Sequence, residues 1–161
     1  MNPAVCREHL DKLLAEEAAA LTRLEGLLDQ EHEFLVANDI DQLERASEAR
    51  QNCVTELLRV EDERRGLCRM LNYSADQFGL EKLFTWCDPS KQLHAKLAAS
   101  ADRATRCRSL NDRNGALVNA RMKRVEGLLG VITGRASQPK VYGRTGAYQT
   151  VATVSRLNAT V

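Results

Sequence analysis

Leucines that repeat every seven residues near the start of the chain constrain its fold more than any other feature. Because an α-helix turns once every 3.6 residues, apolar side chains three, four and seven positions apart lie on one face. The pattern predicts a long helix from Pro3 to about Asn38, with one apolar face packed against another helix. The leucines on this face are Leu10, Leu14, Leu21, Leu24, Leu28 and Leu35.

Similar patterns predict two more long helices. Asp39 is a good N-cap for the second helix, and the short connection predicts that the first two helices run antiparallel. The third is predicted to begin at Asp88-Pro89, an N-cap residue followed by proline, and to stop at Gly134. The apolar positions of the second helix include Leu43, Ala46, Cys53, Leu57, Val60, Leu67 and Leu71, and those of the third include Leu93, Leu97, Ala104, Cys107, Val118, Met122, Val125, Leu128, Leu129 and Ile132.

Charged residues interrupt the apolar faces of the first two helices. Arg50 and Arg64 fall on the face of the second helix, and Glu17 and Glu31 fall on that of the first. An arginine at such a position must reach solvent or pair with an acid. We therefore expect a partly hydrated contact between the two helices.

The segment between the second and third long helices holds four of the seven aromatic residues. Its sequence Ser74-Ala75-Asp76-Gln77 has the form of a capping box, which predicts a short helix over residues 75 to 87. Two interpretations stay open. The aromatic rings either close one end of the helical bundle, in which case they are buried, or form a partner-binding patch, in which case they are exposed.

Composition agrees with an all-α fold. The chain has 161 residues, and only three are proline, a residue excluded from helix interiors. We predict an elongated bundle of three long helices with a short connecting helix, plus a flexible C-terminal tail. The predicted domains are a helical bundle over residues 1–134 and a flexible basic tail over residues 135–161 that folds on a partner.

Charge is distributed unevenly between these two parts. The first 134 residues carry 19 basic and 22 acidic residues, a balance of −3, whereas the tail carries four basic residues and no acid. Four cations over such a length give only a weak phosphate-binding term, so we expect no nucleic-acid partner. The chain shows no secretory leader and no apolar stretch long enough to insert in a membrane, so we predict a cytoplasmic protein.

The sequence offers no arrangement of residues for catalysis or metal binding. His9, His32 and His94 are dispersed, the five cysteines lack a metal-ligand spacing, and no phosphate-binding or nucleophile motif occurs. We therefore predict a protein that is not an enzyme and uses no cofactor. The many acidic side chains are expected on solvated helix faces.

Two asparagines and a glycine stand out in the third helix. Asn111 and Asn114 fall on its apolar face, and Gly115 follows directly. A polar asparagine in a helix seam costs stability but can fix register, and a glycine can admit a close backbone. We predict that these three residues set the specificity of the helix seam, and direct contact with a partner is the alternative.

A short apolar row in the tail is a candidate substrate-binding element. Val151, Val154 and Leu157 are three residues apart, and Val161 follows four positions later, which is the spacing of one helix face. We expect the first three to contact a partner. The valine and threonine content equally allows an added β-strand, so the bound conformation stays open.

Two motifs resemble those of the FlgN family of flagellar export chaperones. The stretch Leu110-Asn111-x-x-Asn114-Gly115-x-Leu117 resembles the Asn-x-x-Asn-Gly signature of that family, and Tyr142-Gly143-Arg144-Thr145-Gly146 is similar to its Tyr-x-x-x-Gly motif. The order of the predicted parts resembles the family as well, with two long antiparallel helices, an irregular segment, a third long helix and a polar tail.

The resemblance implies a cytoplasmic chaperone that binds the two hook-filament junction proteins before their secretion. It implies delivery of these substrates to the flagellar type III export gate, whose cytoplasmic domain is then a second partner. In such a protein the C-terminal region holds the substrate and the tail tyrosine, Tyr142, docks on the gate. The additional Tyr148 leaves open which tyrosine docks.

A self-associating structural coiled-coil protein is the alternative function. Three long helices with charged residues on their seams can leave a groove that another copy of the chain fills, and a homodimer is then expected.

Overall fold

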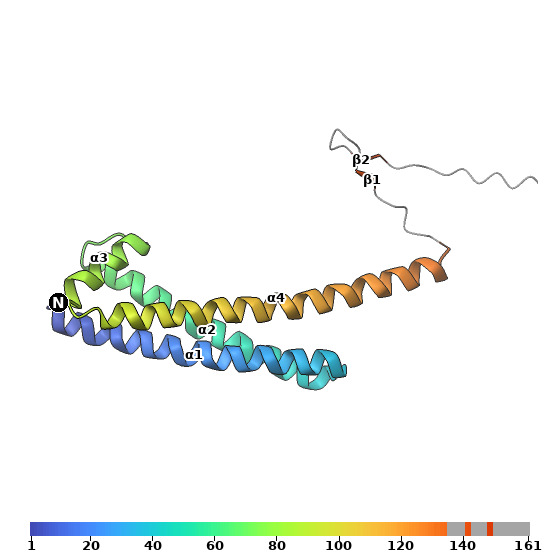
Figure 1. Ribbon diagram of the computed structural model, residues 1–161, viewed down its shortest axis with the longest axis horizontal. Coiled ribbons are helices and arrows are strands. Elements are labelled where there is room, and N and C mark those ends of the chain that lie inside the picture. Colours follow the sequence, from blue (N-terminus) through green and yellow to red (C-terminus); the bar gives the residue numbers. More distant parts are fainter. Residues whose placement is uncertain (135–140, 143–147, 150–161) are drawn as a thin grey trace, which may run out of the picture. The chain divides into compact units, whose positions relative to one another are not determined.

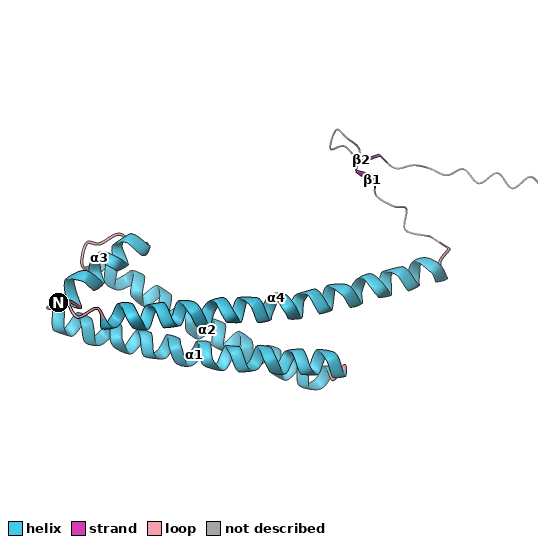
Figure 2. Ribbon diagram, viewed as in Figure 1, coloured by secondary structure: helices cyan, strands magenta, loops and turns pink. Residues whose placement is uncertain are grey.

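The computed structural model describes residues 1–134, 141–142 and 148–149. The chain divides into two compact units, Met1–Val118 and Asn119–Val161. The predicted all-α fold, with three long helices and a short connecting helix, is confirmed for the described residues (Figures 1 and 2). The elements are α1 (Pro3–Ala37), α2 (Ile40–Met70), α3 (Gln77–Cys87), α4 (Gln92–Ile132), β1 (Val141–Tyr142) and β2 (Tyr148–Gln149).

Capping residues mark both ends of α1 and the start of α2, and the start at Pro3 and the Asp39 cap agree with the prediction. The Asn2 side chain accepts a hydrogen bond from the Val5 N–H at 2.9 Å, and Pro3 is the first residue of α1. Asn38 adopts a left-handed conformation with φ of 58°, which ends α1. The predicted N-cap Asp39 accepts from the Gln42 N–H at 3.2 Å and begins α2. These local signals suffice to place the α1–α2 turn.

Apolar rows with a spacing of seven residues join the long helices of the first unit. The main core lies where α3 and the start of α4 meet α1 and α2 (Figure 1). Phe84 of α3 is 1% exposed there, and its ring meets that of His94 edge-on with 5.4 Å between centroids. The buried members of this core are Cys6, Leu10, Leu13, Leu14, Val60, Leu67, Cys68, Leu83, Phe84, Cys87 and Leu93.

The aromatic connecting segment divides between the two predicted roles. Phe84 is buried and Tyr73 packs partly buried against the core, as the bundle-closing interpretation requires. Phe78, however, is 75% exposed with the Lys82 ammonium 5.9 Å from its ring centroid, and Trp86 is also exposed. One side of α3 therefore closes the core and the other presents aromatic rings to solvent.

The start of α3 differs from the predicted capping box. Asp76, and not Ser74, is the N-cap residue, because its Oδ1 accepts the Gly79 N–H at 2.8 Å. The Ser74 hydroxyl donates to that same oxygen at 2.7 Å. A carboxylate also interacts more favourably than a hydroxyl with the positive end of the helix dipole. The helix therefore begins at Gln77 rather than at residue 75.

The predicted start of the third long helix is wrong by three residues. The Asp88–Lys91 segment forms a turn instead, in which the Lys91 N–H donates to the Asp88 carbonyl at 3.0 Å and Lys91 has φ of 57°. The fully buried Asp88 carboxylate accepts from the Ser90 hydroxyl at 2.7 Å and from the Leu93 N–H at 2.6 Å. Asp88 thus still serves the N-terminus of α4, but from across this turn.

We expect Asp88→Asn to flatten the acid dependence of stability. Burial raises the pKa of the Asp88 carboxyl, but the bonds from Ser90 and Leu93, together with the Arg7 charge, outweigh it and lower that pKa overall. A carboxyl with a lowered pKa in the folded state contributes stability that is lost as the pH falls through that pKa. Urea unfolding between about pH 5 and about pH 2 measures this loss.

The Asp88→Asn chain should be less stable than the native chain at neutral pH and approach it in acid. Asp102→Asn, at an exposed position of α4, is the control. Equal acid slopes for the native and Asp88→Asn chains would contradict the assignment.

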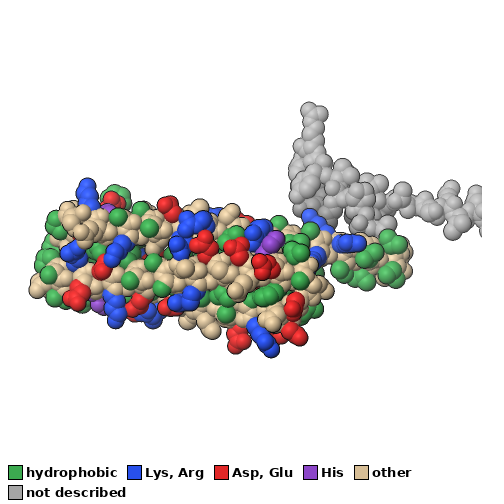
Figure 3. Space-filling model, turned by 60° about the horizontal axis from the view of Figure 1, so that its bottom comes forward, with side chains coloured by type: hydrophobic (Ala, Val, Ile, Leu, Met, Phe, Trp, Pro, Cys, Tyr) green, Lys and Arg blue, Asp and Glu red, His purple; other side chains and the backbone are tan. Residues whose placement is uncertain are grey.

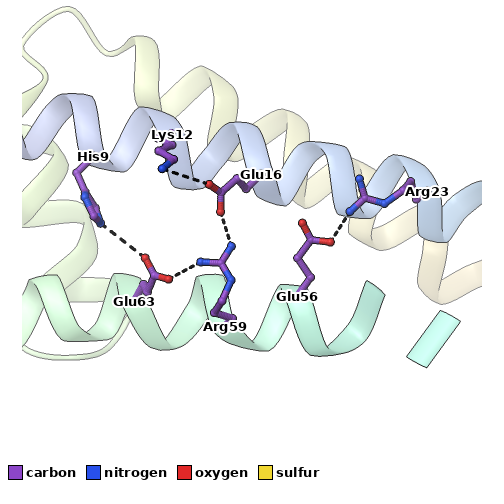
Figure 4. A network of polar contacts seen from close by, with 7 residues as sticks. All are labelled: His9, Lys12, Glu16, Arg23, Glu56, Arg59 and Glu63. Atoms are coloured by element: carbon purple, nitrogen blue, oxygen red, sulfur yellow. Dashed lines mark hydrogen bonds and ion pairs between the residues drawn. The ribbon is translucent and has the colours of Figure 1, made fainter. Parts of the chain in front are cut away.

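Ion pairs connect α1 and α2 along their exposed edge (Figure 4). Arg59 of α2 pairs with Glu16 of α1 and with Glu63 on its own helix, while Nε2 of His9 lies 3.8 Å from Glu63. Inside the contact, Arg64 pairs with Glu17. The charged residues expected within this seam are therefore ion-paired.

Candidate functional site

A polar cluster lies within the seam between α1, α2 and α4. Asn114 of α4 is only 5% exposed, and its side-chain amide donates to the Leu28 carbonyl of α1 at 2.8 Å. Its Oδ1 lies 3.1 Å from Nδ1 of His32. Asn114, which belongs to the Asn-x-x-Asn-Gly motif, therefore makes two contacts with α1.

The second asparagine reaches the opposite helix of the seam. Asn111 is exposed, and its Oδ1 accepts from the Arg50 guanidinium of α2 at 3.4 Å. Nε of Arg50 also lies 3.0 Å from the buried Glu31 carboxylate of α1. Burial raises the pKa of the Glu31 carboxyl despite the opposing effects of Arg50 and Asn114. The two asparagines thus link α4 to both other long helices.

Gly115 does not admit a close backbone within the described part of the chain. A Cβ added there would meet no atom within 4 Å, and the residue is exposed. The expectation that this glycine lets another described backbone approach is therefore wrong. Because Gly115 is exposed, contact with a partner stays a prediction for this residue.

An exposed apolar face, here called the α4 stripe, occupies the part of α4 in the second unit. Its members recur at helical spacing over residues 122–132, and each is at least half exposed. Apolar side chains gather on the last turns of α4, which lie toward the right of Figure 3. The charged residues among them are mainly basic, with Arg121, Lys123 and Arg124 against Glu126. The stripe consists of Met122, Val125, Leu128, Leu129 and Ile132.

The apolar pattern predicted packed positions for these five side chains, but all five are exposed. Periodicity identifies the apolar face of a helix but not the length over which a partner covers it. The signal that could have found the stripe is helix length. α4 has 41 residues, against 35 in α1 and 31 in α2, so the shorter helices cannot cover every turn of the longest one.

The tail residues predicted as functional are only partly described. Tyr142 lies in β1 and pairs in antiparallel register with Tyr148 of β2, so the backbone brings the two candidate docking residues opposite each other. Val151, Val154 and Leu157 lie outside the described residues.

Metal binding and membrane insertion find no support among the described residues. No group of three or more histidine, cysteine or acidic side chains that could hold a metal ion occurs in that part of the chain. All five cysteines are free and buried, and burial raises the pKa of the Cys6 thiol to about 12. No described helix is both long and apolar enough to cross a membrane.

Comparison with known proteins assigns the chain to a family. A family model described as FlgN protein matches residues 6–150, which cover both motifs and most of the chain. No curated protein and no solved structure matches the chain.

Proposed function

We propose that this chain, which belongs to the FlgN family of flagellar export chaperones, binds hook-filament junction proteins in the cytoplasm. It then delivers these proteins to the flagellar type III export gate. It acts by binding alone, without catalysis or a cofactor. The observation that carries the proposal is the α4 stripe, an exposed apolar face on an otherwise charged helix. Such faces on soluble proteins are typical of interaction sites.

The α4 stripe suits an unfolded substrate segment that forms a helix on binding. Apolar side chains at helical spacing are the anchors by which a helix face recognises an amphipathic partner. Ordering such a segment costs about 2–5 kcal/mol, which weakens the complex and favours later release to the export machinery. In this proposal Val151, Val154 and Leu157 of the tail add further apolar contacts to the substrate.

Docking on the cytoplasmic domain of the export gate is assigned to Tyr142. The β1–β2 register sets Tyr142 and Tyr148 opposite each other in the backbone, so Tyr148 stays the alternative docking residue. The polar links of Asn111 and Asn114 support a structural role in which they hold the three long helices in register.

Changing the α4 stripe should abolish substrate capture. We expect the triple variant Val125→Gln, Leu128→Gln and Ile132→Gln to weaken binding of a purified junction protein at least about 30-fold, since each change removes apolar burial. Glutamine keeps a high helix propensity, so α4 is retained. Isothermal titration calorimetry measures the dissociation constant, and circular dichroism confirms the helix content.

Lys123→Gln is the control, because Lys123 is exposed and lies on the opposite side of the helix from the stripe. Its affinity should change less than about twofold. Unchanged affinity in the triple variant would contradict the proposal. Deleting residues 135–161 is expected to weaken capture while leaving the helical unit folded.

The α4 stripe also favours the second candidate, a self-associating coiled-coil protein, because two copies could bury their stripes against each other. Sedimentation separates the two functions. A tight dimer that dissociates in the triple variant and never binds junction protein would support self-association.

A further inference from the structure

Within the first unit, the fully buried row of α4 is poor in large apolar side chains, although Leu97 and Leu110 pack partly buried against the two cores. Its buried residues are spaced seven apart, but only the first is a large hydrocarbon. They are Leu93, Ser100, Cys107 and Asn114. The rows that face them are richer in leucine and valine, with Leu14, Leu21, Leu28 and Leu35 on α1 and Ala46, Cys53, Val60 and Leu67 on α2. Small and polar side chains in such a row lower the affinity of a helix for its partners.

The seam is incompletely filled at Ser100. This side chain is 3% exposed, and its hydroxyl has no hydrogen-bond partner among the described residues. Beside it lies a cleft of about 320 Å³ between α1 and α4. Its lining includes the small side chains of Ala15 and Ala18 on α1 and of Ala99 on α4, and the remaining lining residues are Leu14, Thr22, Lys96 and Arg103. A larger apolar side chain at this position would therefore find space and replace an unsatisfied hydroxyl.

Exposed ion pairs of one polarity supply much of the remaining contact. Every anion comes from α1 and every cation from α4. These side chains are about one-third to one-half exposed, so each pair contributes little and is screened by salt. The pairs are Lys96 with Asp11, Arg103 and Arg106 with Glu25, and Arg113 with Asp29.

The start of α4 is attached much more firmly. Leu93 is buried in the main core, and its N–H is bound by the Asp88 carboxylate. Residues 96–118 therefore form the weakly held part of a helix whose first turn is fixed.

We propose that residues 96–118 of α4 exchange with a helix of a partner protein, one that carries bulky apolar residues at heptad spacing and Lys or Arg on its flank. Such a helix keeps the ion pairs with Asp11, Glu25 and Asp29 and fills the cleft that Ser100 leaves. The α1–α2 face is thereby a second docking surface, independent of the α4 stripe and of the proposed export function.

A synthetic peptide tests the exchange directly. It has the sequence of residues 96–118 with S100L, C107L and N114L, and it is titrated with the full-length chain by fluorescence anisotropy at low salt. We expect a dissociation constant of about 10 µM, because the gain from three leucines must overcome the high effective concentration of the tethered helix. Hydrogen exchange in residues 96–118 of the chain should rise on binding.

Three controls separate exchange from non-specific adhesion. A peptide with the native residues should bind at least about tenfold more weakly. Ser100→Leu in the chain fills the cleft and should weaken peptide binding about tenfold, whereas Ala104→Leu at an exposed position of α4 should not. The chain variant Asp11→Asn, Glu25→Gln and Asp29→Asn should leave the affinity nearly unchanged, because the native helix and the peptide lose the same ion pairs, whereas a peptide that adheres by charge alone would bind more weakly.

Absence of binding, or binding without increased exchange in residues 96–118, would overturn the proposal. Equal binding to the Ser100→Leu and native chains would overturn it too. A dimer in which two copies exchange α4 would also overturn the proposal, because the native α4 sequence would then be sufficient for the exchange.

Discussion

Replacing Phe84 with alanine is expected to destabilise the fold by about 3–5 kcal/mol, the largest loss from any single side chain in the main core. Phe84 is the largest of the fully buried side chains, and it lies where α1, α2 and α3 converge on the start of α4. Removing the ring leaves a cavity that rigid helices on several sides cannot close, and it removes the edge-on contact with His94. Urea unfolding followed by circular dichroism measures the free energy of unfolding.

Phe78→Ala is the control for this prediction. Phe78 belongs to the same helix and is the same residue type, but it is 75% exposed. Its replacement should change stability by less than about 0.5 kcal/mol, as is usual for surface positions. Similar losses at the two positions would mean that α3 does not close the core with its Phe84 side.

The long helices could be predicted from the sequence because their signals are local. A heptad row such as that of Leu14, Leu21, Leu28 and Leu35 identifies a helix face, and Asp39 marks where the next helix begins. Both signals depend only on residues within a few turns of one another. The same periodicity placed four charged residues on these faces but left their pairing open. The structure pairs Arg50 with Glu31 and Arg64 with Glu17.

The errors arose where distant residues decide the outcome. Asp88 has the local signal of an N-cap, but its carboxylate is also fixed by Arg7 of α1, and the chain makes a full turn before α4 begins. Aromatic content could not show that Phe84 points inward and Phe78 outward, because both fit the α3 helix equally well. That distinction depends on how α3 packs against the other helices.

The candidate site was predicted less completely than the fold. The Asn111–Asn114 motif was found because polar residues stand out on an apolar face, and its contacts with α1 and α2 lie where that face predicts. The α4 stripe was missed because leucines that pack against a helix and leucines that stay exposed have the same helical spacing in the sequence. Only the extent of the neighbouring helices distinguishes them.

Gly79→Ala is the second substitution for which a large effect is expected, about 3 kcal/mol of destabilisation. A Cβ at Gly79 would lie 1.8 Å from the Ser74 carbonyl oxygen, which is backbone and cannot rotate away as a side chain would. Relieving the clash must move the 74–76 loop and break the bond from the Gly79 N–H to Asp76. Thermal unfolding and the near-ultraviolet signal of Trp86 report the loss.

Gly115→Ala adds the same methyl group as Gly79→Ala, but we expect it to stabilise the chain. Nothing lies within 4 Å of an added Cβ at Gly115, and alanine favours a helix interior by about 0.5–1 kcal/mol over glycine, so this variant should be more stable than the native chain. If Gly115→Ala instead destabilises the chain, Gly115 must make a close contact that is absent among the described residues. If it stabilises the chain but weakens junction-protein binding, the glycine of the Asn-Gly motif serves a partner rather than the fold.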